Sequence, residues 1–131
     1  MKISRILQII TLSFIITSCA TTQLIEQGNK AFKQGNYTET LHALEQIIES
    51  KENRGKNAKG EVYFKAGKSA LELEKINKAR KYLESAQQME YDLPELYASL
   101  AKIYKIIDNL SKEITALEDY HNKFPEGEKI N

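Results

Sequence analysis

The chain has 131 residues, with 19 Lys and Arg against 18 Asp and Glu, so its formal net charge is only +1. This balance is not that of a nucleic-acid-binding protein, which would carry a basic excess. The length allows one domain with a modest core, and the single cysteine excludes a disulfide bond within the chain.

Residues 1–18 have the pattern of a secretory signal peptide. Lys2 and Arg5 form a short positive start. The apolar run over residues 6–17 that follows is shorter than the roughly 20 residues needed to span a bilayer. We therefore expect residues 1–18 to be removed, which leaves a mature chain with 17 Lys and Arg against 18 Asp and Glu.

Cys19 stands directly behind Ile16, Thr17 and Ser18, where an ordinary secretory signal would end in an Ala-x-Ala motif. This arrangement resembles the lipobox of bacterial lipoproteins. The resemblance implies that the Cys19 thiol receives a diacylglyceryl group, that the chain is cut before it, and that the new amino terminus is acylated, for example with palmitate. Two or three acyl chains would make membrane attachment permanent. An uncleaved anchor and a buried free cysteine are the alternatives.

The residues after the cysteine bear on localisation. In the lipoprotein family an aspartate at this place holds many enterobacterial members at the inner membrane, whereas this chain has Ala20. We therefore expect a lipid-anchored protein of the cell envelope, at the outer membrane and facing the periplasm. Residues 19–22 would form the anchor and a short tether, without a flexible stalk.

Three segments of the remaining chain align as internal repeats, over residues 21–54, 60–93 and 94–127. Gly28, Gly67 and Ala101 are small at the same place in each repeat, which permits a close approach of two helices. Gly35-Asn36 and Asp108-Asn109 supply turn residues between helices. The pattern predicts a pair of helices in each repeat and contains no strand signal.

The segment from Gly28 to Thr40, with Gly35-Asn36-Tyr37 at its turn, resembles the tetratricopeptide repeat. The resemblance implies an all-α fold, a right-handed superhelical stack of helical hairpins with about three repeats and six helices. The repeat domain would cover residues 21–127, and residues 128–131 would form a tail. An unrelated bundle of helical hairpins is the alternative.

Three residues depart from the family pattern. Thr40 and Glu113 stand where alanine is preferred, and Tyr120 stands at a second alanine position. Because a charged side chain inside a helix pair is costly, Glu113 predicts that the last repeat is looser or rotated.

Stacked repeats of this kind use their first helices to form a concave surface that binds segments of other proteins. The family pattern implies ten groove-facing positions in this chain. They are Ile25, Asn29, Phe32 and Lys33 in the first repeat, Phe64, Lys68 and Leu71 in the second, and Ala98, Lys102 and Lys105 in the third.

Asn29, Lys68 and Lys102 occupy the same step of successive repeats, where some family members clamp a peptide carboxylate. The match is partial, because the lysines that those members also use one turn earlier are absent here. We hypothesise that the groove favours a peptide with acidic and apolar residues. The alternative is that these lysines are ordinary solvated side chains.

Residues 51–81 hold ten Lys and Arg against four acids, whereas residues 82–131 hold five against ten. The basic region could meet anionic lipid, an acidic membrane-protein loop or a wall polymer, or could serve only as a solvated surface.

The last helix is predicted to leave apolar surface uncovered at the end of the array, at Ile114, Leu117, Tyr120 and Phe124. Self-association or a partner subunit would cover this surface. A terminal helix with enough polar cover is the alternative.

The chain shows no pattern typical of an enzyme, a cofactor site or a metal site. His42 and His121 are the only histidines, lie in different repeats, and have no partner at metal-ligand spacing. Glu118 and Asp119 are adjacent on a predicted helix and point to different faces. The expected function is a non-catalytic one, that of an envelope scaffold or adaptor that binds a partner protein segment. The alternative is a surface protein that binds anionic lipid or cell-wall polymer through residues 51–81.

Overall fold

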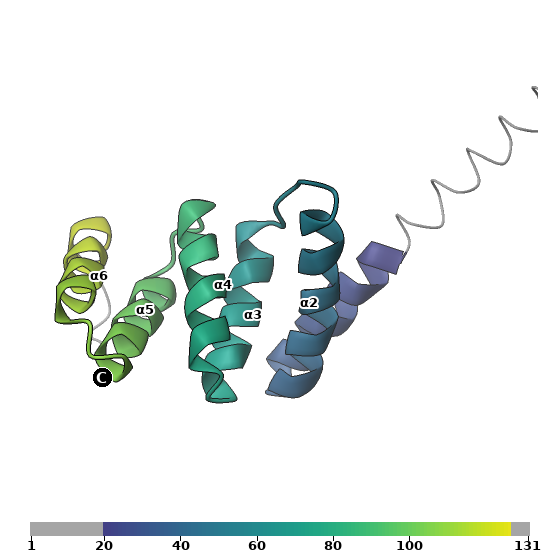
Figure 1. The fold of residues 1–131 in the computed structure, drawn as a ribbon, viewed down its shortest axis with the longest axis horizontal. Coiled ribbons are helices and arrows are strands. Elements are labelled where there is room, and N and C mark those ends of the chain that lie inside the picture. The colour runs from purple at the N-terminus through teal and green to yellow at the C-terminus, as the bar shows by residue number, and fades with distance from the viewer. Residues whose placement is uncertain (1–19, 127–131) are drawn as a thin grey trace, which may run out of the picture.

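A computed structural model describes residues 20–126 of the chain (Figure 1). Within this range the chain forms six helical segments and no strand, which confirms the predicted all-α fold. The first segment covers residues 20–33. It is followed by α2 (Tyr37–Glu52), α3 (Gly60–Glu72), α4 (Ile76–Gln88), α5 (Pro94–Ile106) and α6 (Leu110–Lys123).

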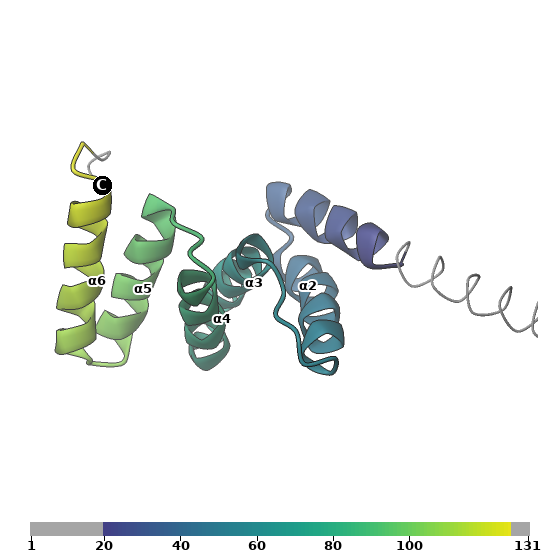
Figure 2. The ribbon, with the colours of Figure 1, turned by 90° about the horizontal axis from the view of Figure 1, so that it is seen from above.

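The helices form three hairpins that follow one another along the long axis of the molecule (Figures 1 and 2). Helix α3 packs against both α2 and α4, and α5 packs against both α4 and α6. Most contacts are therefore made between neighbours in the chain, and α3 also touches α5, as expected for a stack of repeats. None of the described helices is long and apolar enough to cross a bilayer.

The turns inside the three hairpins share one backbone conformation. Gly35, Glu74 and Asp108 occupy equivalent places, and all have positive φ, at 70°, 57° and 54°. After each of them the next amide donates to the carbonyl five residues earlier, at 2.8 to 2.9 Å. This is the Schellman ending of a helix, which favours glycine because a left-handed residue with a Cβ is strained. The repeat period thus extends to the backbone of the turns.

Small residues let the two helices of a hairpin approach closely. A Cβ added to Gly28 would lie 2.6 Å from Leu44 Cδ2, and one added to Gly67 would lie 2.6 Å from Leu83 Cγ. Leu44 and Leu83 are 1% and 0% exposed, so each fills the space that a glycine leaves open. Their burial supplies part of the hydrophobic driving force for the hairpin.

Asparagine caps start two of the second helices. The Asn36 side chain accepts a hydrogen bond from the Glu39 amide at 3.2 Å, and the Asn109 side chain accepts one from the Lys112 amide at 3.2 Å. These caps satisfy donors that the first helical turn leaves unpaired. The predicted turn residues therefore act partly as helix caps.

The three departures from the family pattern are accommodated differently. Thr40 is fully buried, and its hydroxyl donates to the Asn36 carbonyl at 2.9 Å. Glu113 is only half-buried, so its carboxylate keeps contact with water. Tyr120 is half-buried and packs against the core beside Phe124, with 5.8 Å between ring centroids.

The predicted tether is part of the first helical segment. Residues 20–22 are helical, and helix continues through residue 33. The described residues of the expected tether thus extend the first helix. Residues 1–18 and Cys19, on which the signal-peptide and lipidation predictions depend, lie outside the described residues.

Candidate protein-binding surface

A cavity of about 470 Å³ lies between the second hairpin and α5. Its wall includes Leu71 at the end of α3, Ile76 at the start of α4, and Ile106 at the end of α5. Leu71 is buried, whereas Ile106 is 51% exposed. The cavity therefore offers open apolar surface to a ligand.

Charged side chains stand at the same cavity. Lys102 of α5 lies on one side, and Glu72 and Glu74 lie on the other. All three are exposed. Within residues 20–126, Lys102 makes no ion pair, whereas Glu72 lies 3.9 Å from Lys68. Lys102 is thus a cation that an acidic residue of a bound peptide can reach.

Lys68, the second residue of the predicted carboxylate clamp, is already paired. Its Nζ lies 3.0 Å from Glu95 Oε1 of α5, and its side chain is only 17% exposed. A peptide carboxylate would have to displace Glu95 to reach it. Lys68 therefore joins the second and third repeats in this structure.

Asn29, the first clamp residue, also bonds to its neighbouring repeat. Its side-chain oxygen accepts a hydrogen bond from Lys65 Nζ at 2.7 Å. The same Nζ pairs with Glu61 and lies 5.9 Å from the centroid of the Phe32 ring. The structure brings Asn29 and Phe32 together around Lys65, which the sequence pattern did not single out.

The remaining predicted groove residues divide into buried and exposed ones. Phe64 is 3% exposed because Tyr91 covers it, with 5.6 Å between the ring centroids. Ile25 is half-buried against the core, and Ala98 is half-buried. Lys33 and Lys105 are exposed, on the first helical segment and on α5.

Of the predicted groove residues, the cavity brings together Leu71 and Lys102, and it adds Ile76 and Ile106, which were not predicted. The sequence carries one signal for Ile106, an apolar residue directly before the Ile107-Asp108 turn. That signal does not distinguish an exposed isoleucine from a core residue, because the distinction depends on the neighbouring repeat.

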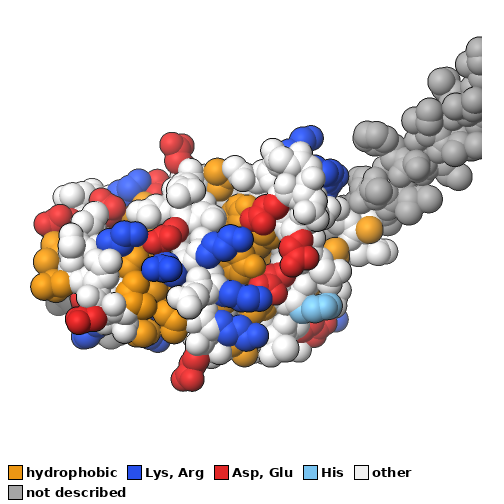
Figure 3. All heavy atoms as spheres, in the orientation of Figure 1, with side chains coloured by type: hydrophobic (Ala, Val, Ile, Leu, Met, Phe, Trp, Pro, Cys, Tyr) orange, Lys and Arg blue, Asp and Glu red, His pale blue; other side chains and the backbone are white. Residues whose placement is uncertain are grey.

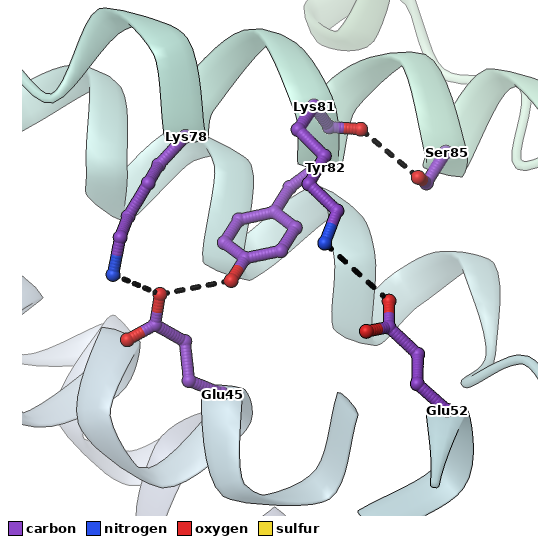
Figure 4. A network of polar contacts seen from close by, with 6 residues as sticks. All are labelled: Glu45, Glu52, Lys78, Lys81, Tyr82 and Ser85. Atoms are coloured by element: carbon purple, nitrogen blue, oxygen red, sulfur yellow. Dashed lines mark hydrogen bonds and ion pairs between the residues drawn. The ribbon is translucent and has the colours of Figure 1, made fainter. Parts of the chain in front are cut away.

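Four of the ten cations in residues 51–81 make ion pairs within the described part of the chain, namely Lys65, Lys68, Lys78 and Lys81. Lys78 pairs with Glu45 at 2.7 Å, and Lys81 pairs with Glu52 at 3.6 Å (Figure 4). Lys and Arg side chains therefore lie among acidic ones on the face that Figure 3 shows. An acid-free basic stretch remains in the α2–α3 loop, residues 53–59. Its exposed cations are Arg54, Lys56 and Lys59.

The described residues contain no group of histidine, cysteine, aspartate or glutamate side chains that could hold a metal ion. The strongest pKa shifts belong to structural tyrosines. Burial raises the pKa of the Tyr104 hydroxyl, and its hydrogen bond to Glu84 at 2.9 Å raises that pKa further. Such a tyrosine stays protonated and joins α4 to α5 rather than acting as an acid or base.

No protein-family description matches the chain, and no curated protein sequence is similar to it. Among solved structures, a crystal structure of MamA protein is similar over 79% of this chain, with a TM-score of 0.64 and 21% identity. A second structure, of MamA AMB-1, is similar over 84% of this chain, with a TM-score of 0.67 and 14% identity. The chain spans 54% and 57% of these two structures. At this level of identity the likeness shows the fold, which is a tetratricopeptide-like stack of helical hairpins.

Proposed function

We propose that this protein is a lipid-anchored scaffold or adaptor of the bacterial envelope that binds a segment of a partner protein, as an accessory subunit of an envelope assembly. The proposed anchor is Cys19, and the proposed location is the outer membrane, facing the periplasm. The fold supports the coarser part of this proposal, because tetratricopeptide-like arrays serve as protein-binding scaffolds.

The proposed binding surface rests on one observation. The cavity beside α5 combines the exposed apolar side chain of Ile106 with the exposed cation of Lys102. Sites for peptides pair an apolar contact, which supplies affinity, with a few polar groups that fix the orientation. The cavity thus has the two elements that a peptide site needs.

The chemistry of the cavity defines the segment it would accept. An apolar side chain of the partner would contact Ile76 and Ile106, and an acidic side chain would pair with Lys102. Lys105, one turn of helix from Lys102, adds a second exposed cation on α5. A second acidic residue on the partner would therefore strengthen binding if it lies beside Lys105, away from Glu72 and Glu74.

Photo-crosslinking in cells tests this surface. A photoreactive amino acid placed at Lys102 or Ile106 is expected to capture one defined envelope protein, whereas the same group at His42, an exposed residue of α2, is expected not to capture it. Equal capture from all three positions would mean that the cavity is not the binding surface.

Charge reversal gives the complementary test. With the crosslinker at Ile106, Lys102→Glu is expected to lower capture by about tenfold, because it removes an ion pair and adds a repulsion. Lys30→Glu reverses an exposed charge on the first helical segment, outside the predicted groove positions, and is the matched control. Unchanged capture by Lys102→Glu would end the carboxylate hypothesis.

The localisation is tested separately. Cys19→Ser is expected to move the protein from the detergent-extracted membrane fraction to the aqueous fraction, because no acyl chain can then be attached. Metabolic labelling with palmitate should give a signal for the unmutated chain only. A mature chain that is free in the aqueous fraction with an unmodified thiol contradicts the anchor.

A second candidate function rests on residues 53–59. Arg54, Lys56 and Lys59 form an exposed basic stretch without an acidic residue, which suits anionic lipid headgroups or an acidic wall polymer. Replacing the three cations by glutamine should abolish binding to anionic vesicles or peptidoglycan if this candidate is right. Capture by the crosslinker at Ile106 should be unaffected, so the two functions are distinguishable.

A further inference from the structure

Helix α6 carries an apolar stripe that no other described part of the chain covers. Leu110, Ile114 and Leu117 are 65%, 47% and 43% exposed. A different face of α6 packs inward, where Ala116 is 3% exposed and Tyr120 is half-buried against the core. The helix therefore has two apolar faces, and only one of them is used within residues 20–126. Figure 3 shows apolar side chains at the end of the array where α6 lies.

One residue of the stripe stands at a place that is buried in the other two hairpins. Leu44, Leu83 and Leu117 occupy the same place in α2, α4 and α6, and their exposed fractions are 1%, 0% and 43%. Helices α2 and α4 are each followed by a further helix that packs on them, α3 and α5. Within the described residues no helix does so for α6. Two differences accompany the exposure of Leu117. Leu44 and Leu83 pack on Gly28 and Gly67 of their own hairpins, whereas the equivalent residue of α5 is Ala101, and no further helix covers α6 within residues 20–126.

The spacing of the stripe suits pairing with an identical helix. Leu110, Ile114, Leu117 and His121 follow one another at intervals of four, three and four residues, the pattern of the apolar seam in paired helices. We propose that the protein forms a homodimer in which the α6 helices of two copies pack antiparallel along this seam.

The flanking charges select the antiparallel orientation. In an antiparallel pair, Glu113 lies opposite Tyr120 of the second copy, and Ser111 lies opposite Glu118 of the second copy. A parallel pair would place Glu113 beside Glu118 of the second copy, and two like charges next to one another are unfavourable. Along the antiparallel seam Ile114 meets Leu117 of the second copy, and Leu110 meets His121.

A head-to-tail arrangement of copies is unfavourable. At the other end of the array the first helical segment and the start of α2 line a shallow recess, and its exposed side chains include Gln23, Glu26, Gln27 and Lys30. Packing this surface on the apolar stripe would remove Glu26 and Lys30 from water, which is costly. The two stripes are complementary to one another, so the contact closes as a two-fold dimer.

Sedimentation velocity on the full chain in a density-matched detergent tests the dimer. The unmutated chain is expected to pass from monomer to dimer as its concentration rises, since so small an interface binds weakly. Ile114→Lys should weaken the dimer at least about tenfold, because it places a charge in the seam. Asn122→Lys adds the same charge to the same helix away from the stripe and should leave the dimer unchanged.

A charge pair tests the orientation. Leu110→Glu alone is expected to weaken the dimer about tenfold. Combining it with His121→Lys should restore most of the affinity, because each glutamate then faces a lysine of the second copy. In a parallel dimer the double variant would place glutamate beside glutamate and lysine beside lysine, and affinity would fall further. That outcome overturns the antiparallel arrangement.

Two outcomes overturn the dimer itself. If residues 127–131 cover the stripe, the full chain sediments as a monomer, and a variant that ends at residue 126 dimerises. If both chains stay monomeric at every concentration, a different molecule covers the stripe. A circular dichroism melt of Ile114→Lys serves as the folding control, and it should match that of Asn122→Lys because both side chains are exposed.

Discussion

Tyr82 of α4 donates its hydroxyl hydrogen to the Glu45 carboxylate of α2 over 2.8 Å (Figure 4). Lys78 Nζ donates to the same carboxylate oxygen at 2.7 Å. The first and second repeats are thus joined on this side by a polar contact as well as by packing. Burial raises the pKa of the Tyr82 hydroxyl, and the bond to Glu45 raises it further, so the tyrosine remains a donor at neutral pH.

The Tyr82→Phe substitution tests this bond. It should lower the free energy of unfolding by about 1 kcal/mol, because Glu45 loses one donor but keeps Lys78. Tyr37→Phe is the control, since the Tyr37 hydroxyl makes no hydrogen bond within residues 20–126. Urea denaturation of both variants measures the difference. Equal effects would mean that the bond contributes nothing.

Acidic pH should destabilise the fold through two carboxyl groups. Partial burial acts to raise the pKa of Glu45, but the hydrogen bonds from Lys78 and Tyr82 outweigh it and the pKa is lowered. Hydrogen bonds from Lys123 and Tyr97 lower the pKa of Asp92. Groups with a lowered pKa stabilise the fold above their unfolded values, about 4.3 and 3.9, and lose this effect as pH falls through the folded values.

The measurement is the free energy of unfolding as a function of pH. It should fall below about pH 5, and Glu45→Gln should make that fall shallower because one titrating group is gone. Glu49→Gln changes an exposed carboxyl group one turn away and is the control. Parallel pH profiles for Glu45→Gln and the unmutated chain would contradict the assignment.

The close helix contact at Gly67 predicts that alanine is more destabilising there than at Gly28. An added Cβ at Gly67 would lie 3.0 Å from the backbone nitrogen of Leu83, whereas at Gly28 its nearest neighbour is the end of the flexible Leu44 side chain. Gly67→Ala should therefore cost about 1–3 kcal/mol, even though alanine favours a helix. Gly28→Ala should cost less.

Thermal or urea denaturation of the two variants decides this prediction. If Gly28→Ala is as destabilising as Gly67→Ala, the backbone of α4 is not what limits the approach of α3. A stabilised Gly67→Ala would show that the first helix of the second repeat can move away from α4.

The hairpin turns predict opposite effects for two substitutions. Glu74 has φ of 57°, which is strained for a residue with a Cβ, and an equivalent turn already uses Gly35. Glu74→Gly should therefore raise the free energy of unfolding by up to about 1 kcal/mol, and Gly35→Ala should lower it by about 1 kcal/mol. Chemical denaturation checks both. A loss of stability in Glu74→Gly would mean that its side chain contributes more than the strain costs.

The backbone of the hairpins was predictable from the sequence because it depends on local chemistry. Gly35-Asn36 and Asp108-Asn109 combine a residue that tolerates positive φ with one that caps the next helix. The same turn at Glu74-Lys75 carries neither type of residue, and only the repeat period predicts it. Periodicity was therefore more informative than turn composition at this place.

The sequence by itself determined the all-helical repeat, since small residues, apolar stripes and turn residues recur at a fixed period and each acts within one hairpin. Only the tertiary structure decided which predicted groove residues stay open. Tyr91 covers Phe64 and Glu95 pairs with Lys68, while Lys102 remains exposed at the cavity. Glu95 reaches Lys68 across a repeat boundary, and Tyr91 reaches Phe64 from the loop that ends the same repeat. The pattern of helical positions within one repeat contains neither partner.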